Sequence, residues 1–411
     1  MNKDEEIDKP KVFEMSRFLI VLMSVASGVT AANLYYAQPL GEKLSQFFNV
    51  SSTLIGIAAM LIQLGYAMGL VFLVPLGDIK EHRSLIMTML FCSMIALLGL
   101  SFASNVGWFL AGSLLVGLTS VTPMLIVTLA AHLANPAKRG RVIGSVMSGL
   151  LIGILLSRTF SGIVGSALGW QAVYRIAAIM MGLLILIFKL SIPKTIPDAV
   201  MSYGKLLRSL TVLLRNQHTL REASLVGAMM FATFSTFWTT LSFLLKSPTY
   251  NLGTQVAGMF GLIGVAGALA ATVVGRIADK KSPRFTLSIA IVFTSTAFIC
   301  FWFFGYRMWG LVLGTILLDL GVQSGQISNQ SRINALDASA RSRNNAVYMA
   351  FYFIGGALGS FLGSLFWGIL GWTGVCIVGI SFQIIAAIVH FRGMKTEKCC
   401  NYKEIVNLKE D

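Results

Sequence analysis

Charged residues are scarce in this sequence. Asp, Glu, Lys and Arg make up 12% of its 411 residues, about half of the roughly 25% typical of a soluble globular protein. Residues 52–77 and 223–245 carry no charge at all, and a run of about 20 apolar residues is long enough to cross the hydrocarbon core of a bilayer. The scarcity of charge therefore excludes a soluble globular protein and indicates an all-α polytopic membrane protein.

Patterns typical of metal, nucleotide and disulfide sites are also missing. The five Cys have no metal-ligand spacing and imply no disulfide framework. No GxGxxG sequence follows a predicted strand, and no Walker motif is present. The four His lie at or near the ends of predicted spans and form no ligand cluster; they are His82, His132, His218 and His390. We therefore expect no cofactor, no bound metal and no catalytic residue.

Hydropathy predicts twelve membrane spans. They are expected at residues 17–40, 52–76, 84–104, 107–131, 142–167, 171–192, 223–245, 253–278, 285–305, 308–331, 345–370 and 372–392. An even number of spans places both termini on the same side of the membrane. The predicted fold is thus a bundle of transmembrane helices with little chain outside the bilayer.

Positive charge is distributed unevenly across these spans. With cytoplasmic termini, most of the 32 Lys and Arg fall on the cytoplasmic side. The exceptions are Lys43, Arg175, Lys246 and Arg307 outside and Arg158 within a span. This is the positive-inside distribution. The net charge of +15 therefore orients the protein in a bacterial inner membrane, with both termini cytoplasmic, and does not indicate a nucleic-acid partner.

The longest polar break divides the chain into two sets of six spans. We expect a cytoplasmic N-terminus at 1–16, a six-helix bundle at 17–192, a cytoplasmic linker at 193–221, a second bundle at 222–392 and a tail at 393–411. Within the linker, leucines share one helical face: Leu206, Leu210, Leu213 and Leu214. That pattern fits a basic helix on the membrane surface and a packed linker helix equally well.

The two halves repeat each other. The sequence GDIKEHR at 77–83 aligns with IADKKSPR at 277–284, and KRGR at 138–141 aligns with ARSR at 340–343. A Gly-Trp pair at 169–170 recurs at 371–372. Such internal symmetry is expected of a secondary transporter whose substrate site lies between the halves at mid-membrane.

At these residues the chain resembles the major facilitator superfamily, over residues 17–392. The resemblance implies two pseudo-symmetric six-helix bundles, alternating access and a cytoplasmic gate in which Asp78 contacts the start of span 11. The gate residues are Gly77, Asp78, Arg83, Asp279 and Arg284. Helix capping and membrane topology would also explain these residues. The segment ANLYYAQPL at 32–40 resembles a bacterial efflux branch of the superfamily.

Span 5 departs from the pattern of proton-driven exporters in this superfamily. Arg158 occupies the position of their proline, and Ser113 in span 4 stands where antiporters often carry an arginine. The resemblance also implies that spans 5 and 8 meet across the halves, where small residues allow close approach. The helix-packing candidates are Gly153, Gly162, Gly258, Gly261, Gly264 and Gly267.

Two opposite charges lie at similar depth. Arg158 follows Arg141 by 17 residues, on the order of 25 Å along a helix, and Asp319 precedes Asn334 by 15 residues, roughly 22 Å. A charge at the bilayer centre costs about 2.5–3.5 kcal/mol, so we expect both to face the aqueous pathway, with Asp319 exchanging a proton or contacting substrate. Direct pairing is an alternative; so are outward snorkelling of Arg158 and a local hydrogen bond of Asp319.

Polar and aromatic side chains suggest the lining of that pathway. Gln323, Gln326 and Gln330 extend a stripe from Asp319 along span 10. Since the resemblance implies that spans 1, 4, 7 and 10 line the cavity, further candidates are Thr30, Asn33, Tyr36, Phe231, Phe234 and Trp238. Ordinary packing explains the aromatic residues at least as well.

Together these features predict a transporter that moves a small organic solute by alternating access, as a proton-coupled efflux antiporter. An importer or facilitator of the same fold is the alternative, and a membrane enzyme or a sensor is a remote one. The expected partners are the solute, protons and the lipid bilayer, and the protein is expected to be a monomer.

Overall fold

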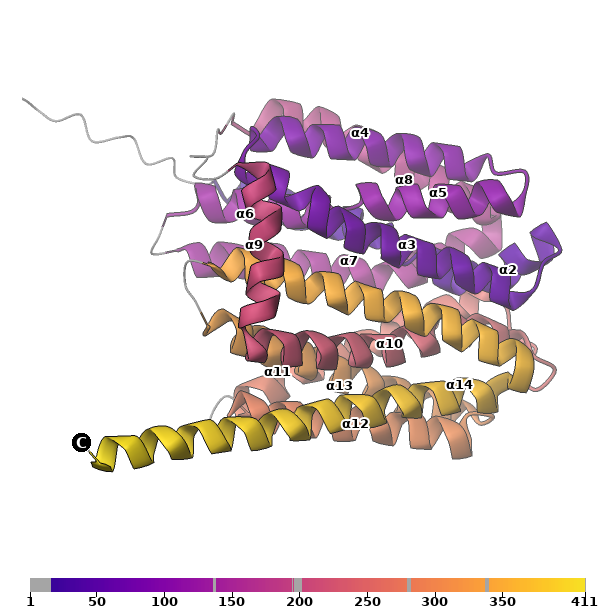
Figure 1. Cartoon of the computed structure of the whole chain (residues 1–411). Coiled ribbons are helices and arrows are strands. Elements are labelled where there is room, and N and C mark those ends of the chain that lie inside the picture. Colours follow the sequence, from indigo (N-terminus) through magenta and orange to yellow (C-terminus); the bar gives the residue numbers. More distant parts are fainter. Residues whose placement is uncertain are drawn as a thin grey trace, which may run out of the picture.

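The computed structural model describes residues 16–135, 138–193, 195, 202–278, 282–336 and 340–410. Every regular element in that part of the chain is a helix. Most helices run side by side along one direction, and one short helix, α9, crosses an end of the bundle (Figure 1). The predicted all-α fold is confirmed.

The first half of the protein comprises α1 to α8. Its elements are α1 (Arg17–Ala32), α2 (Ala37–Phe48), α3 (Ser52–Phe72), the 3₁₀-helix η1 (Val74–Asp78), α4 (His82–Ser101), α5 (Val106–Thr119), α6 (Thr122–Leu133), α7 (Arg139–Leu168) and α8 (Trp170–Ser191). The linker helix α9 (Tyr203–Asn216) leads to the second half, which contains α10 (His218–Lys246), α11 (Thr254–Ala278), α12 (Pro283–Phe304), α13 (Met308–Asn334) and α14 (Arg341–Glu410).

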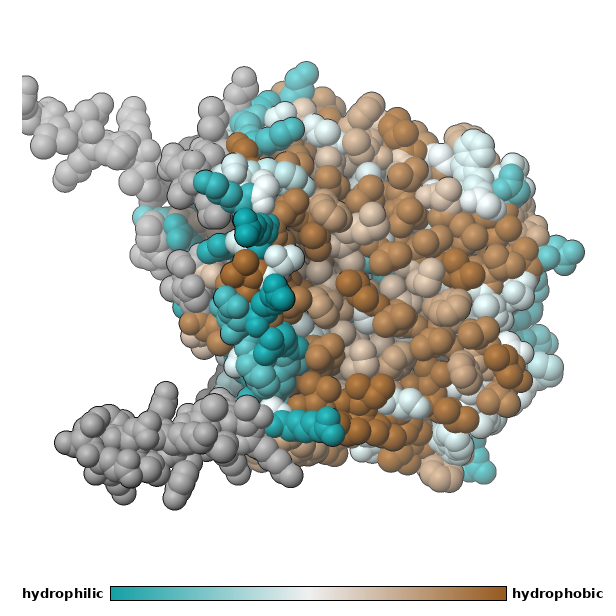
Figure 2. All heavy atoms as spheres, in the orientation of Figure 1, coloured by the Kyte–Doolittle hydropathy of each residue, from teal (hydrophilic) through white to brown (hydrophobic). Residues whose placement is uncertain are grey.

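These helices account for the predicted spans. Among the described residues, ten segments are long and apolar enough to cross a membrane. One of them, Arg341–Met394, contains two spans because α14 turns back at Gly371, and α11 adds a shorter apolar stretch, Thr254–Val265. Figure 2 shows the corresponding surface, a broad hydrophobic belt with hydrophilic side chains gathered at both ends of the helices. The belt has the character of a surface that faces lipid.

Two of the predicted spans are broken. A turn at residues 33–36 separates α1 from α2, and residues 120–121 separate α5 from α6. Pro123 lies in the first turn of α6, where its missing N–H group costs no helical hydrogen bond. Breaks of this kind change the direction in which the following side chains point.

The repeated Gly-Trp pair makes the same turn in both halves. Gly169 and Gly371 have φ angles of +86° and +60°, which glycine adopts without the steric penalty of a side chain. The tryptophans that follow, Trp170 and Trp372, are buried, and the indole of Trp372 donates a hydrogen bond to the carbonyl of Phe301 at 2.9 Å. The glycine ends one span, and the tryptophan anchors the next.

Helix α9 crosses the end of the bundle where the C-terminus also lies (Figure 1); we call this the α9 end and the opposite one the far end. Leu206 and Leu210 are buried, and the hydroxyl of Tyr203 donates to the carbonyl of Phe72 at 2.7 Å. The leucine face of the linker therefore packs on the protein.

The halves meet along two seams. On one seam α7 packs against α11, where a Cβ atom on Gly162 would lie 2.7 Å from the Cα atom of Gly258. On the other, α3 packs against α14, and the side-chain amide of Gln63 donates to Ser360 Oγ at 2.7 Å. Gly153 lies elsewhere: it packs against Gly28 of α1, inside the first half.

A buried ion cluster ties the second half together at the α9 end. Glu222 of α10 is 4% exposed and accepts two hydrogen bonds from Arg284 of α12, at 3.1 and 3.0 Å. Arg332 of α13 lies 2.9 Å from the same carboxylate, and His390 of α14 lies 3.9 Å from it. One carboxylate thus holds four helices.

Replacing Glu222 with Gln should destabilise the protein. Removing one member of a buried ion cluster leaves the others without their counter-charge, which costs about 3–5 kcal/mol. Thermal unfolding of the purified protein in detergent should show a clearly lower Tm for Glu222→Gln than for Glu42→Gln, a partly exposed control in α2. Equal Tm values would show that the cluster does not stabilise the fold.

Candidate functional site

Arg158 of α7 and Asp319 of α13 form a charged layer in the interior, with one charge from each half. Both side chains are fully buried, at 0% exposure. Arg158 therefore does not extend to the surface, although arginines near helix ends often do. A buried charge normally requires a partner or a ligand, so the surroundings of both groups matter.

Arg158 is held by a hydrogen bond and three aromatic rings. Its Nε donates to the Oε1 atom of Gln38 at 2.8 Å. Its guanidinium carbon lies 4.1 Å from the ring centroid of Trp238, 5.0 Å from that of Tyr35 and 5.4 Å from that of Phe234. Aromatic faces attract cations at such distances, so this cage fixes the guanidinium and partly compensates for its lost hydration.

Asp319 rests on the glycine face of α11. A Cβ atom on Gly264 would lie 3.3 Å from both carboxylate oxygens and 3.3 Å from the Cζ2 atom of Trp238. One turn away, a Cβ atom on Gly261 would lie 3.0 Å from the Cβ atom of Arg158. The glycines thus allow both charged residues to approach the backbone of α11, and Trp238 packs against the same glycine face.

The charged groups keep unused hydrogen-bonding capacity. Nη1 and Nη2 of Arg158, both carboxylate oxygens of Asp319 and Nε1 of Trp238 are buried without a hydrogen-bond partner among the described residues. Arg158 and Asp319 interact electrostatically, but they form no ion pair within 4.0 Å in the described structure. Direct pairing, one of the sequence-based alternatives, is therefore not formed in this state.

A cavity of about 70 Å³ adjoins this layer between the halves. Gln323 and Gln326 line it, as their stripe on α13 predicts, and the hydroxyl of Tyr352 lies 3.4 Å from Gln326 Oε1. Tyr35 and Phe234 line the cavity and also contact the guanidinium of Arg158. Their rings therefore lie between the cavity and the guanidinium. Further lining residues are Leu34, Tyr66, Ile154, Phe231, Met349 and Phe353.

Several predicted lining residues point elsewhere. Thr30 donates to the carbonyl of Ala26 in its own helix at 2.7 Å, Asn33 faces Met181 of α8, and Gln330 faces Met349 Sδ at 3.9 Å. None of these three is among the residues that line the cavity, and neither is Trp238, which lies in the charged layer.

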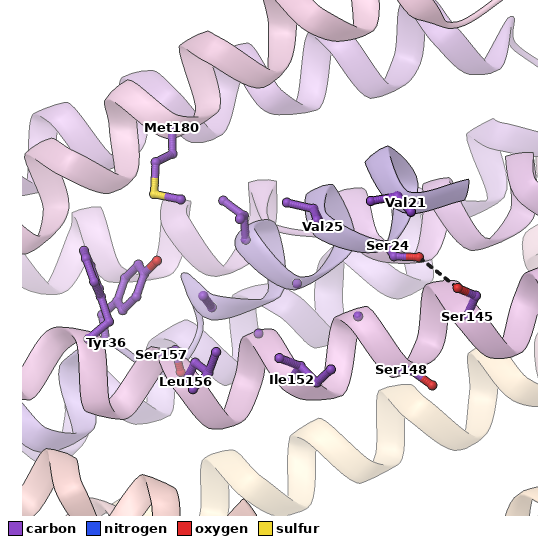
Figure 3. Close-up of a pocket in the computed structure, with 16 residues that line it drawn as sticks. Val21, Ser24, Val25, Tyr36, Ser145, Ser148, Ile152, Leu156, Ser157 and Met180 are labelled. Carbon is purple, nitrogen blue, oxygen red and sulfur yellow. Dashed lines mark hydrogen bonds between the residues drawn. The ribbon is translucent and has the colours of Figure 1, made fainter. Parts of the chain in front are cut away.

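A larger hollow lies between α1, α7 and Met180 of α8, with a volume of about 630 Å³ (Figure 3). Tyr36 lines this hollow and not the central cavity. Exposed apolar side chains such as Val25 and Ile152 flank it, and Ser24 and Ser145 lie 3.4 Å apart along it. Its apolar walls place it on the hydrocarbon-facing surface.

The predicted gate residues have different contacts. Asp78 interacts electrostatically with Arg343 at the start of α14, across the two halves. Arg83 instead donates to the carbonyls of Ile192 and Lys189, at 3.0 and 2.6 Å, at the end of α8. Positive charge is favourable at a helix C-terminus.

Two other gate candidates have contacts within their own half. Gly77 is buried beside Leu125 of α6, and Arg284 binds Glu222 within its own half. Asp279 lies outside the described residues.

Sequence reasoning missed Gln38, Tyr35, Tyr66 and Tyr352. Gln38 is a buried amide, and it is the polar residue in the otherwise apolar stretch at residues 37–41. A polar residue in such a stretch could have marked it as a candidate. The tyrosines carry no such signal, because a buried tyrosine packs in a core as often as in a site.

Known proteins resemble this chain over most of its length. Residues 18–340 match the Major Facilitator Superfamily. The chain is 39% identical to "Uncharacterized transporter YgaY" of Escherichia coli O157:H7, over 94% of this chain and 98% of that protein. It is 23% identical to "Probable sugar efflux transporter" of Helicobacter pylori (strain P12), over 77% of this chain and 76% of that protein.

Solved structures share the fold at low sequence identity. The nucleoside transporter NupG has a TM-score of 0.74 and 15% identity, covering 92% of this chain and 99% of its own. A bacterial homolog of the human lysosomal transporter Spinster, in an inward-facing and unoccupied conformation, has a TM-score of 0.72 and 14% identity, covering 91% of this chain and 95% of its own.

Replacing Gln38 with Ala should weaken the charged layer. The change removes the acceptor of the Arg158 Nε hydrogen bond, and a hydrogen bond to a charged group contributes about 1.5–3 kcal/mol. We expect a lower Tm in detergent for Gln38→Ala than for Gln46→Ala, an exposed control in the same helix. If Gln38→Ala unfolds at the wild-type temperature, Gln38 does not hold the guanidinium.

Proposed function

Because the chain belongs to the major facilitator superfamily, we propose that this multi-pass membrane transporter exports a small organic solute by alternating access in exchange for protons. In this proposal it acts as a monomer in the bacterial inner membrane, with the α9 end in the cytoplasm. The observation that carries the proposal is the charged layer, in which Arg158 and Asp319 come from different halves and are fully buried beside the central cavity.

A site with one charged residue from each half is suited to alternating access. Transporters of this architecture move one half against the other around a site near the bilayer midplane. Since Arg158 and Asp319 attract each other without a direct bond, the halves can separate without breaking a formed ion pair. The glycine contact between Gly162 and Gly258 supplies a smooth surface on which α7 and α11 can move.

Protons are the proposed coupling ion because Asp319 can gain and lose one. Protonation removes the negative member of the charged layer and so changes the attraction between the halves. A ligand that alters the balance between two conformations is thermodynamically coupled to every other ligand that binds those conformations with unequal affinity. Proton binding at Asp319 would therefore change the affinity for the solute.

Export is supported by two resemblances, the segment at 32–40 and the similarity to a sugar efflux transporter. An importer or facilitator of the same fold is the second candidate. It is favoured by Arg158 and Ser113, which replace residues that proton-driven exporters and antiporters of the superfamily carry.

Replacing Asp319 with Asn should abolish coupling to protons. In liposomes, with a solute identified by a resistance and accumulation screen, wild-type uptake should respond to an imposed pH gradient. At saturating solute the variant should still exchange labelled for unlabelled solute, but its response to the gradient should be lost, because the asparagine side chain cannot take up a proton. Glu42→Gln serves as the control at the far end. A full gradient response in Asp319→Asn would rule out this role.

Replacing Asp78 with Asn should shift the protein toward a state open at the α9 end, because the attraction to Arg343 across the halves is lost. Hydrogen exchange at the start of α14 should become faster, whereas Lys80→Gln, an exposed neighbour, should leave it unchanged. Combining Asp78→Arg with Arg343→Asp should restore part of the protection. No change in exchange in Asp78→Asn would exclude a gating role.

A further inference from the structure

The free edges of Arg158 and Asp319 differ in chemistry. Because Nε of Arg158 is bound to Gln38, its Nη1 and Nη2 atoms remain as a pair of donors without a partner among the described residues. Two parallel N–H groups of this kind match a carboxylate. Both oxygens of Asp319 are likewise without a partner in the described part of the chain, and a carboxylate matches an ammonium group.

One indole lies beside both charges. The ring centroid of Trp238 lies 4.1 Å from the guanidinium carbon of Arg158, and the indole Cζ2 atom and both carboxylate oxygens of Asp319 each lie 3.3 Å from the position that a Cβ atom on Gly264 would take. Its Nε1 atom is buried and has no partner among the described residues. The indole therefore offers a spare hydrogen-bond donor close to the guanidinium of Arg158.

We propose that the charged layer binds a small zwitterion, with its carboxylate on the Nη edge of Arg158 and its ammonium group on Asp319. The inference rests on the proposed transport function and gives it a substrate class, that of α-amino acids and betaines. The bound solute bridges the halves, because the two recognition groups belong to α7 and α13.

Charge balance favours a zwitterion over other solutes. An anion would leave Asp319 buried without a partner, and a cation would do the same to Arg158; each unpaired buried charge carries a large desolvation cost. A neutral polar solute can hydrogen-bond to both groups but supplies a counter-charge to neither. A zwitterion pairs with both, so the loaded carrier has no uncompensated charge when the halves move.

The neighbouring cavity indicates that the solute is small. The cavity has a volume of about 70 Å³, and Tyr35 and Phe234 stand between it and the guanidinium of Arg158. A solute that enters from the cavity must displace these two rings. Bulky side chains are therefore expected to weaken binding.

Ligand-dependent thermal stability of the purified protein in detergent tests the proposal without a transport assay, because a ligand that binds the folded state raises the Tm. The probes are α-amino acids and betaines and, for each amino acid, the methyl ester, the N-acetyl derivative and the N-acetyl methyl ester. We expect at least one small zwitterion to raise the Tm, and its single-charge derivatives to bind at least about tenfold more weakly, since each loses a charge-assisted contact. If no zwitterion raises the Tm, or if an ester or N-acetyl derivative binds as well as the parent, the proposal is wrong.

Two variants should change the preference for the zwitterion over its single-charge derivatives in opposite directions. In Asp319→Asn the N-acetyl anion should bind as well as the zwitterion, and in Arg158→Gln the ester cation should do so. Glu42→Gln, remote from the layer, should keep the wild-type order. A purely structural role would lower the Tm without altering the order of ligands, and that result would contradict the proposal. If a solute without opposite charges is transported in liposomes while no zwitterion binds, the proposed transport function stands and the substrate class falls.

Discussion

Two opposite charges that are buried without forming an ion pair constrain the rest of this structure. Burying Arg158 and Asp319 at 0% exposure costs free energy. The single hydrogen bond that Arg158 donates to Gln38 and a cage of aromatic rings offset this cost only in part. Helix α11 carries glycine at Gly261 and Gly264, because any Cβ atom there would crowd one of the charged side chains. The position of the charges thus accounts for the composition of a helix that carries neither of them.

The sequence repeat does not imply equal contacts in the two halves. Arg83 and Arg284 occupy matching positions, yet Arg83 binds backbone carbonyls at the end of α8, whereas Arg284 binds the buried carboxylate of Glu222. Both arginines stabilise their own half. Asp78, from the same motif as Arg83, instead interacts electrostatically with Arg343 of the other half, so residues of one motif act both within a half and across the halves.

The size of a hollow is a poor guide to function in this fold. The hollow beside α1 and α7 is about 630 Å³ but is walled by apolar side chains on the lipid-facing surface. The central cavity is about 70 Å³, yet amides and aromatic rings from both halves line it, and it adjoins the charged layer. Chemistry and position between the halves, rather than volume, identify the site.

The sequence by itself determined the spans, the recurrence of the Gly-Trp pair where one span ends, and the positions of Arg158 and Asp319 well inside their helices, because hydropathy and residue spacing fix positions along a helix. Periodicity also placed Gln323 and Gln326 on the cavity side of the unbroken helix α13. Tertiary structure decided the rest. The helix is broken at residues 33–36, and on that side of the break Tyr35 and Gln38 reach Arg158, whereas Asn33 faces Met181 of the first half. Rotation about a helix axis depends on the neighbouring helices, and spacing within one segment does not contain that information.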